Sequence, residues 1–351
     1  MLRVRRSRGL IVLCGLGVLC VLPLTRLDGA ERRIATIEFF GHKGIDTAVI
    51  RAALPFHEGD ELSQGEGAKE RVRDAVVRAI GKQATDVNAV CCTADGGILL
   101  FIGLPGGSYR EFAYSPHPQG DARVSTELEQ LDERMGKALV AAVQKGGDAA
   151  LEDDSQGYAL IRDPAAHSVQ LTLRRYALAH EPELVRVLES SADSHQRAIA
   201  SHALGYARQS ARQVLALSRA ARDPDEEVRN NATRAIAVLV RANGRFARQI
   251  PPDTFIEMLN SGIWTDRNKG ALVLERLTVK RDAAVLAKLK TVALDSLIEM
   301  TQWREANHAY AARMLLGRVA GIPEPRLEEL AWKGPPETIV EALAGKPGGV
   351  R

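Results

Sequence analysis

Cysteine and aromatic residues are scarce in this sequence of 351 residues. Only Cys91 and Cys92 of its four cysteines lie beyond the first thirty residues, which are too few for a disulfide framework. Neighbouring residues of a strand point to opposite faces, so we expect one buried and one exposed thiol, with an intermolecular disulfide through the exposed thiol as the alternative. Aromatic residues make up 5% of the chain, which leaves few stacking platforms for bases or sugars.

Catalytic and metal-binding motifs are missing as well. The sequence has no HExxH, no metal-spaced cysteine pair, no Gly-Lys-Ser/Thr phosphate loop and no Gly-x-Ser-x-Gly elbow. His195 and His202 share one face of an expected helix, which fits half a metal site or, as we favour, ordinary histidines. The sequence therefore predicts no catalytic residue, no metal and no cofactor. A triad assembled from distant residues leaves an enzyme with a dispersed site as an alternative.

An excess of basic charge is confined to the start of the chain. The whole chain has 47 basic and 44 acidic residues, and residues 1–30 hold five arginines and one aspartate. The remainder then has 42 basic and 43 acidic residues. Because nucleic-acid binding depends on a basic surface, this balance argues against a nucleic-acid partner.

Residues 1–30 have the pattern of a secretory signal. Basic residues precede an apolar run over residues 10–24, which as a helix of ~1.5 Å per residue spans roughly 22 Å, short of the ~30 Å membrane core. Cleavage after Ala30 would leave an exported, periplasmic or envelope-associated protein. Asp28 is unusual three residues before a cleavage site, so an uncleaved N-terminal anchor is the alternative, and the only membrane association that we expect.

Residues 31–105 predict a compact α/β module. Alternating apolar residues, capping residues and turns predict the order strand, helix, helix, strand, strand, over residues 34–39, 46–54, 64–80, 87–93 and 98–104. The string IEFFGHKGIDTAVIRAALPFHEGDEL, with Gly41 after the first strand and Gly59 before the second helix, resembles the POTRA family. This resemblance implies docking to envelope proteins or binding of an extended peptide at a sheet edge. The third strand departs from the family pattern because Gly103-Leu104-Pro105 stands where an acidic residue usually follows.

Residues 106–163 predict a linker with one helix. Residues 106–125 are rich in Gly, Pro and Ser, and apolar residues recur at helical spacing over 126–144. Residues 145–157 predict a polar loop whose acidic run, Glu152 to Asp154, lacks the spacing of a calcium-binding loop. We expect this run to be solvated.

Residues 164–345 contain a helical pattern that repeats. SADSHQRAIASHALGYA and DPDEEVRNNATRAIAVL align with an offset of 32 residues, which superposes Arg197 on Arg229. A third copy places Arg267 there, and a fourth surrounds HAYAARMLLG. An apolar helix precedes each copy. The region resembles HEAT repeats, which implies a curved solenoid with an extended concave surface.

The sequence thus predicts an α+β N-terminal module followed by an all-α, HEAT-like solenoid. Its predicted function is a non-catalytic scaffold of the bacterial envelope that binds protein partners through the repeats and an extended peptide at the sheet edge. An accessory part of an outer-membrane assembly or secretion system is an alternative. The candidate interaction surface comprises Arg197, Arg229, Arg267 and Trp303. The alternative is a structural role for these residues: Arg229 would pair with Asp223 and support the start of a helix, and the tryptophan would pack between repeats.

Overall fold

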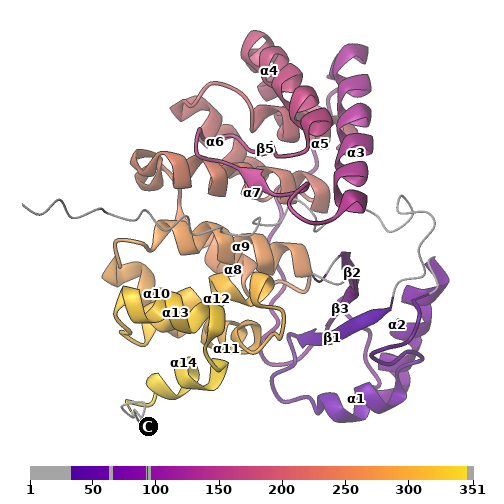
Figure 1. Cartoon of the computed structure of the whole chain (residues 1–351), viewed down its shortest axis with the longest axis vertical. Helices are drawn as coiled ribbons and strands as arrows, with labels where there is room; N and C mark the ends of the chain where they lie inside the picture. Colours follow the sequence, from indigo (N-terminus) through magenta and orange to yellow (C-terminus); the bar gives the residue numbers. More distant parts are fainter. Residues whose placement is uncertain (1–32, 63–65, 92, 94–95, 346–351) are drawn as a thin grey trace, which may run out of the picture.

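A computed structural model describes residues 33–62, 66–91, 93 and 96–345, and Figure 1 shows their arrangement. The chain is predominantly helical and has a small mixed sheet of three strands. The expected signal, Cys92 and residues 94–95 of the turn expected between the second and third strands lie outside the described residues. No helix in the described part of the chain is long and apolar enough to cross a membrane.

The N-terminal elements follow one another in the predicted order. They are β1 (Ile34–Phe40), α1 (Thr47–Ala53), α2 (Glu66–Ile80), β2 (Asp86–Cys91) and β3 (Ile98–Gly103). The strand order in the sheet is β1-β3-β2, with β1 parallel and β2 antiparallel to β3. Helix α1 begins where Asp46 accepts the N–H of Ala48 at 2.9 Å, the capping contact expected from the sequence.

The sheet is covered on both faces. Ile102 on one face packs with Ile50 of α1 and Val76 of α2. Phe101 on the other face packs against the rings of Trp264 and Trp303, with centroids 4.9 and 5.0 Å apart. Every residue of β3 is buried as a result, which suits its almost continuous apolar sequence. The sheet therefore shares a core with the helices that follow it.

Residues 126–345 form mainly helices, which pack in pairs (Figure 1). The elements are α3 (Thr126–Lys145), α4 (Pro164–Ser190), α5 (Ser194–Leu204), α6 (Ala211–Ala220), α7 (Glu226–Ala242), the 3₁₀ helix η3 (Gly244–Gln249), α8 (Pro252–Met258), α9 (Trp264–Leu277), α10 (Ala283–Val292), α11 (Leu294–Thr301), α12 (Ala306–Val319), α13 (Glu324–Lys333) and α14 (Pro336–Ala342). Helices α5, α7, α9 and α12 contact one another in succession, and we term them the inner helices. Helices α6, α8 and α11 pair with α7, α9 and α12.

The segment predicted as a linker, residues 106–125, is bound along the helical stack, and we term it the strap. It forms no helix or strand, but its backbone bonds to the turns before α5, α7 and α9. The N–H groups of Arg110, Ser115 and Gly120 donate to the carbonyl groups of Asn260, Arg222 and Ser190 at 2.8, 2.7 and 2.7 Å. The segment predicted as a linker is therefore held against the stack, because carbonyl groups of the stack accept hydrogen bonds from backbone N–H groups of the strap.

A short hairpin, β4 (Glu152–Asp153) and β5 (Leu160–Ile161), begins in the polar loop predicted over residues 145–157 and ends beyond it. The side chain of Glu152 is 6% exposed and pairs with Arg234 of α7. Asp154 is also buried and lies 2.9 Å from Arg241. Only Asp153 of the acidic run is exposed, so the prediction of a solvated run is wrong for its other two members.

The expectation of a free core thiol is also corrected. Cys91 ends β2, is 5% exposed and is disulfide-bonded, and its partner is not among the described residues.

Candidate interaction surfaces

The predicted surface arginines occupy equivalent positions in the first turns of α5, α7 and α9, and all are buried. Arg197, Arg229 and Arg267 are 1%, 2% and 0% exposed. Arg197 donates from Nε and Nη2 to both carboxylate oxygens of Asp223 at 2.8 Å, and from Nη1 to the carbonyl of Ser191 at 2.9 Å. Such a bidentate pair holds the guanidinium in one orientation.

The next two arginines repeat this arrangement with other partners. Arg229 donates to both carboxylate oxygens of Asp266 at 2.8 and 3.2 Å and to the carbonyl of Asp223. Arg267 donates to the carbonyl of Ser261 at 2.7 Å and pairs with Glu299 at 3.4 Å. Burial lowers the pKa of Arg267 to about 10. We term Arg197, Arg229 and Arg267 the arginine ladder.

The prediction that these arginines and Trp303 form an interaction surface is therefore wrong. Trp303 is 1% exposed, and its Nε1 donates to the carbonyl of Phe39 in β1 at 3.3 Å. The side chains instead hold turns, helices and the sheet to one another. The pairing and capping of Asp223 with Arg229 considered from the sequence is also wrong in its partners, because the Asp223 carboxylate pairs with Arg197, Arg229 pairs with Asp266, and Asp225 caps α7.

The β1 edge of the sheet is occupied by other parts of the chain. The carbonyl of Ile34 accepts the N–H of Gly59, and that of Ile37 accepts guanidinium groups of Arg51 and Arg304. Arg304, which directly follows Trp303, also pairs with Glu58 and thereby lowers the pKa of that carboxyl to about 2. No peptide can add to this edge without displacing those groups.

The β2 edge has backbone groups that bond to no other strand, and Ala89 on this edge packs in a cluster with Val140 and Val143 of α3. The backbone N–H groups of Ile98 and Leu104 point to β1. The backbone N–H and carbonyl groups of Leu99 and Phe101, which alternate with them, therefore point to β2. The register pairs them with Val90 and Asn88, and this leaves the N–H and carbonyl of Ala89 facing outward. Neither group has a hydrogen-bond partner in the described part of the chain, and Ala89 is half-buried.

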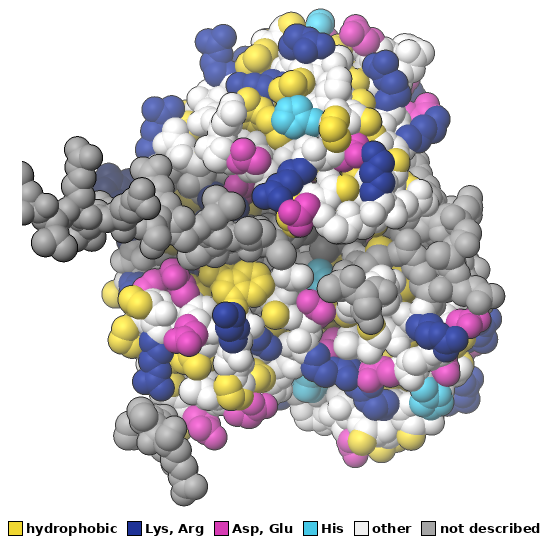
Figure 2. Space-filling model, viewed as in Figure 1, with side chains coloured by type: hydrophobic (Ala, Val, Ile, Leu, Met, Phe, Trp, Pro, Cys, Tyr) yellow, Lys and Arg dark blue, Asp and Glu magenta, His cyan; other side chains and the backbone are white. Residues whose placement is uncertain are grey.

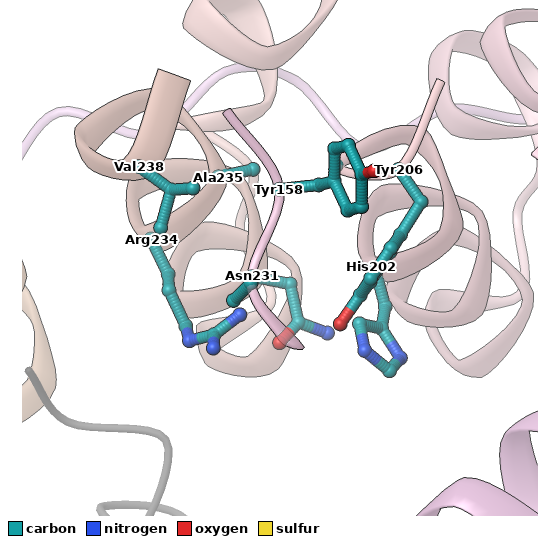
Figure 3. A pocket seen from close by; sticks show the side chains of 9 residues that line it. Tyr158, His202, Tyr206, Asn231, Arg234, Ala235 and Val238 are labelled. Carbon is teal, nitrogen blue, oxygen red and sulfur yellow. The ribbon is translucent and has the colours of Figure 1, made fainter. Parts of the chain in front are cut away.

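A small pocket lies between the hairpin segment and the inner helices α5 and α7 (Figure 3). Its cavity volume is about 20 Å³, far below the ~300–1,000 Å³ of usual small-molecule sites. Figure 3 shows His202, Asn231 and Arg234 extending in the same direction. The remaining lining residues are Tyr158, Ala159, Gly205, Tyr206, Ala235 and Val238.

The side chains of the pocket are mostly committed to structural contacts. His202 Nδ1 lies 2.8 Å from the carboxylate of Asp132 in α3, a geometry that could orient an imidazole base. The lining contains no serine, threonine or cysteine for such a base to activate. Burial raises the pKa of Tyr206 to about 12, and its hydroxyl accepts from Gln170 at 3.0 Å. No group of three or more metal-binding side chains occurs among the described residues.

The sequence matches no family model, and no curated protein matches it.

Proposed function

We propose that the protein is a non-catalytic interaction scaffold that binds an extended peptide at β2. The open backbone groups of Ala89 carry this proposal. An added strand would exchange hydrogen bonds with them, as in other cases of peptide binding at a sheet edge. The stack behind the sheet would hold β2 in place, because Phe101 of the adjacent strand packs on Trp264 and Trp303.

We further propose that the N-terminal module is POTRA-like, that the helical pairs are HEAT-like, and that the protein works in the cell envelope. The order and pairing of the five N-terminal elements support the first assignment. The arginine ladder, at one position of successive inner helices, supports the second. The signal-like residues 1–30 support the location.

A proline at the outward-facing position tests the proposal. Ala89→Pro removes the outward N–H while leaving the bonds between β2 and β3, since Ala89 does not donate to β3. Ala89→Ser keeps the N–H and is the matched control. A displayed library of random extended peptides, selected on the full chain, supplies the probe.

We expect the selected peptides to bind the wild type and Ala89→Ser equally. Ala89→Pro should weaken binding roughly tenfold, because a peptide carbonyl left without its donor costs ~1–3 kcal/mol. Far-UV circular dichroism of both variants checks that the fold is kept. Selection of no peptide, or of peptides that bind Ala89→Pro as tightly as the wild type, would contradict peptide binding at β2.

A further inference from the structure

Arginines also gather at the opposite end of α5 and α7 from the ladder, and these arginines are exposed. Residues 171–178 of α4, 205–215 between α5 and α6, and 243–249 after α7 contain six arginines and no acidic residue. Five of the six are exposed and have no ion pair in the described part of the chain, namely Arg175, Arg208, Arg212, Arg245 and Arg248. We term these three segments the basic edge.

The three segments lie together in space. Arg174, the sixth arginine, stacks over Tyr158 and donates to the carbonyl of Tyr206 at 2.8 Å, which joins α4 to the second segment. Gln209 and Asn243 join the second segment to the third, with 3.4 Å between their side-chain amides. Helix α6 also contacts both α4 and η3. Glu181 of α4 borders the second segment and accepts from the hydroxyl of Ser210 at 3.4 Å.

Exposed leucines stand among these arginines. Leu171 and Leu178 are 37% and 43% exposed and lie two turns apart on α4, with Arg175 between them. Leu215 is 53% exposed and lies one turn after Arg212 on α6. Figure 2 shows basic, apolar and acidic side chains interspersed over the end of the molecule formed by α3 to α7.

We propose that the basic edge binds the surface of a membrane that contains anionic phospholipids. Arginine guanidinium groups bind phosphate oxygens, and leucines between them can enter the boundary between headgroups and acyl chains. The absence of acidic residues from the three segments gives the charge complementarity that such a surface requires. This contact is separate from the apolar run at residues 10–24 and lies on a different part of the protein from β2.

Tryptophan placed on the basic edge reports the contact directly. Leu215→Trp in the full chain should lose fluorescence when vesicles of phosphatidylglycerol and brominated phosphatidylcholine are added, because bromine quenches tryptophan that enters the bilayer. Val279→Trp is the matched control, since Val279 is 57% exposed and lies outside the basic edge. The apolar run at 10–24 is the same in both variants. Vesicles of brominated phosphatidylcholine alone should quench neither introduced tryptophan.

Removal of charge gives a second, quantitative test. The triple variant Arg208→Gln, Arg212→Gln, Arg245→Gln should lower the affinity reported by Leu215→Trp roughly 100-fold, because each arginine near an anionic surface contributes ~1 kcal/mol. The control triple variant Arg78→Gln, Arg326→Gln, Lys333→Gln should leave it unchanged. Salt should weaken the contact. Three results would overturn the proposal: no quenching of Leu215→Trp, equal quenching by neutral vesicles, or binding by the arginine variant at wild-type affinity.

Discussion

Arginine serves two different purposes at the two ends of helix α7. In its first turn Arg229 is 2% exposed and bonds to Asp266 and to a turn carbonyl. Beyond its last turn Arg245 and Arg248 are exposed and have no ion pair among the described residues. A guanidinium group has five donor hydrogens and can be buried only where acceptors meet it. The positions of carboxylates and turn carbonyls therefore separate the arginines that hold the fold from those left free to bind.

The largest expected difference between the two ends is in stability. Arg229→Met should lower the free energy of unfolding by about 3–5 kcal/mol, because it leaves the buried carboxylate of Asp266 without its positive partner and with only the hydroxyl of Ser261. Arg245→Met should change it by less than about 0.5 kcal/mol, as is usual for exposed side chains. Urea unfolding of both variants measures the comparison.

A double variant sharpens this test. Arg229→Met combined with Asp266→Leu removes both charges, and we expect it to recover part of the lost stability. If Arg229→Met and Arg245→Met prove equally mild, the ladder does not hold the fold in the way its contacts indicate.

A smaller, pH-dependent effect on stability is expected where β2 contacts the first turn of α9. Asp86 of β2 accepts the N–H of Trp264 at 2.9 Å, and burial, with Glu226 nearby, raises its pKa to about 7 from 3.8. The unfolded chain therefore loses this proton first, and the wild type loses stability as the pH rises from about 4 to 7. Asp86→Asn should be more stable than the wild type at pH 8 by about 2–4 kcal/mol, and no more stable below pH 4.

The pH dependence of stability expected from Glu58 has the opposite sign. Its pKa is lowered to about 2 by Arg304, so Glu58→Gln should destabilise the protein at neutral pH and lose that effect near pH 2. Thermal unfolding of both variants across this pH range distinguishes the two effects. A stability difference between Asp86→Asn and the wild type that stays constant between pH 4 and 8 would contradict the raised pKa.

The smallest expected effects on stability come from substitutions of two glycines, one in the strap and one in the basic edge. A Cβ at Gly120 of the strap would lie 2.6 Å from the carbonyl oxygen of Ser190, so Gly120→Ala should cost about 1–3 kcal/mol. Gly244, beside the basic edge's arginines, has no atom within 4 Å of such a Cβ, and Gly244→Ala should stabilise by about 0.4–1 kcal/mol. Chemical denaturation measures both, and a tolerated Gly120→Ala would show that the strap is loosely held.

Local patterns in the sequence predict the secondary-structure elements well. Contacts between residues far apart in the sequence are not predicted by such patterns. The predicted helix at 126–144 and the predicted strand at 34–39 agree with α3 and β1 to within one residue at each end. The strap resembles a linker because glycine, proline and serine also suit a segment whose backbone bonds to turns. The buried state of Glu152 depends on Arg234, which lies 82 residues later.

The candidate site was less predictable for the same reason. The 32-residue offset identified Arg197 and Arg229 as equivalent, but their carboxylate partners lie 26 and 37 residues further on and follow no fixed spacing. Composition alone could have found the basic edge, since its three segments lack acidic residues. Only the fold brings those segments together. The open edge at Ala89 depends on strand order, which no local pattern in the sequence specifies.

Hydrogen exchange of the full chain, followed by mass spectrometry, tests the contrast between the two ends of the helices most directly. It measures whether the strap, which lies beside the arginine ladder, is rigid and whether the basic edge is free to bind. We expect peptides that cover Arg110, Ser115 and Gly120 to exchange as slowly as the middle of α7, since their amides bond to turn carbonyls. Peptides that cover 205–212 and 243–249 should exchange faster and become protected when anionic vesicles are added. Rapid exchange throughout the strap, with no vesicle-dependent protection of the basic edge, would contradict the account.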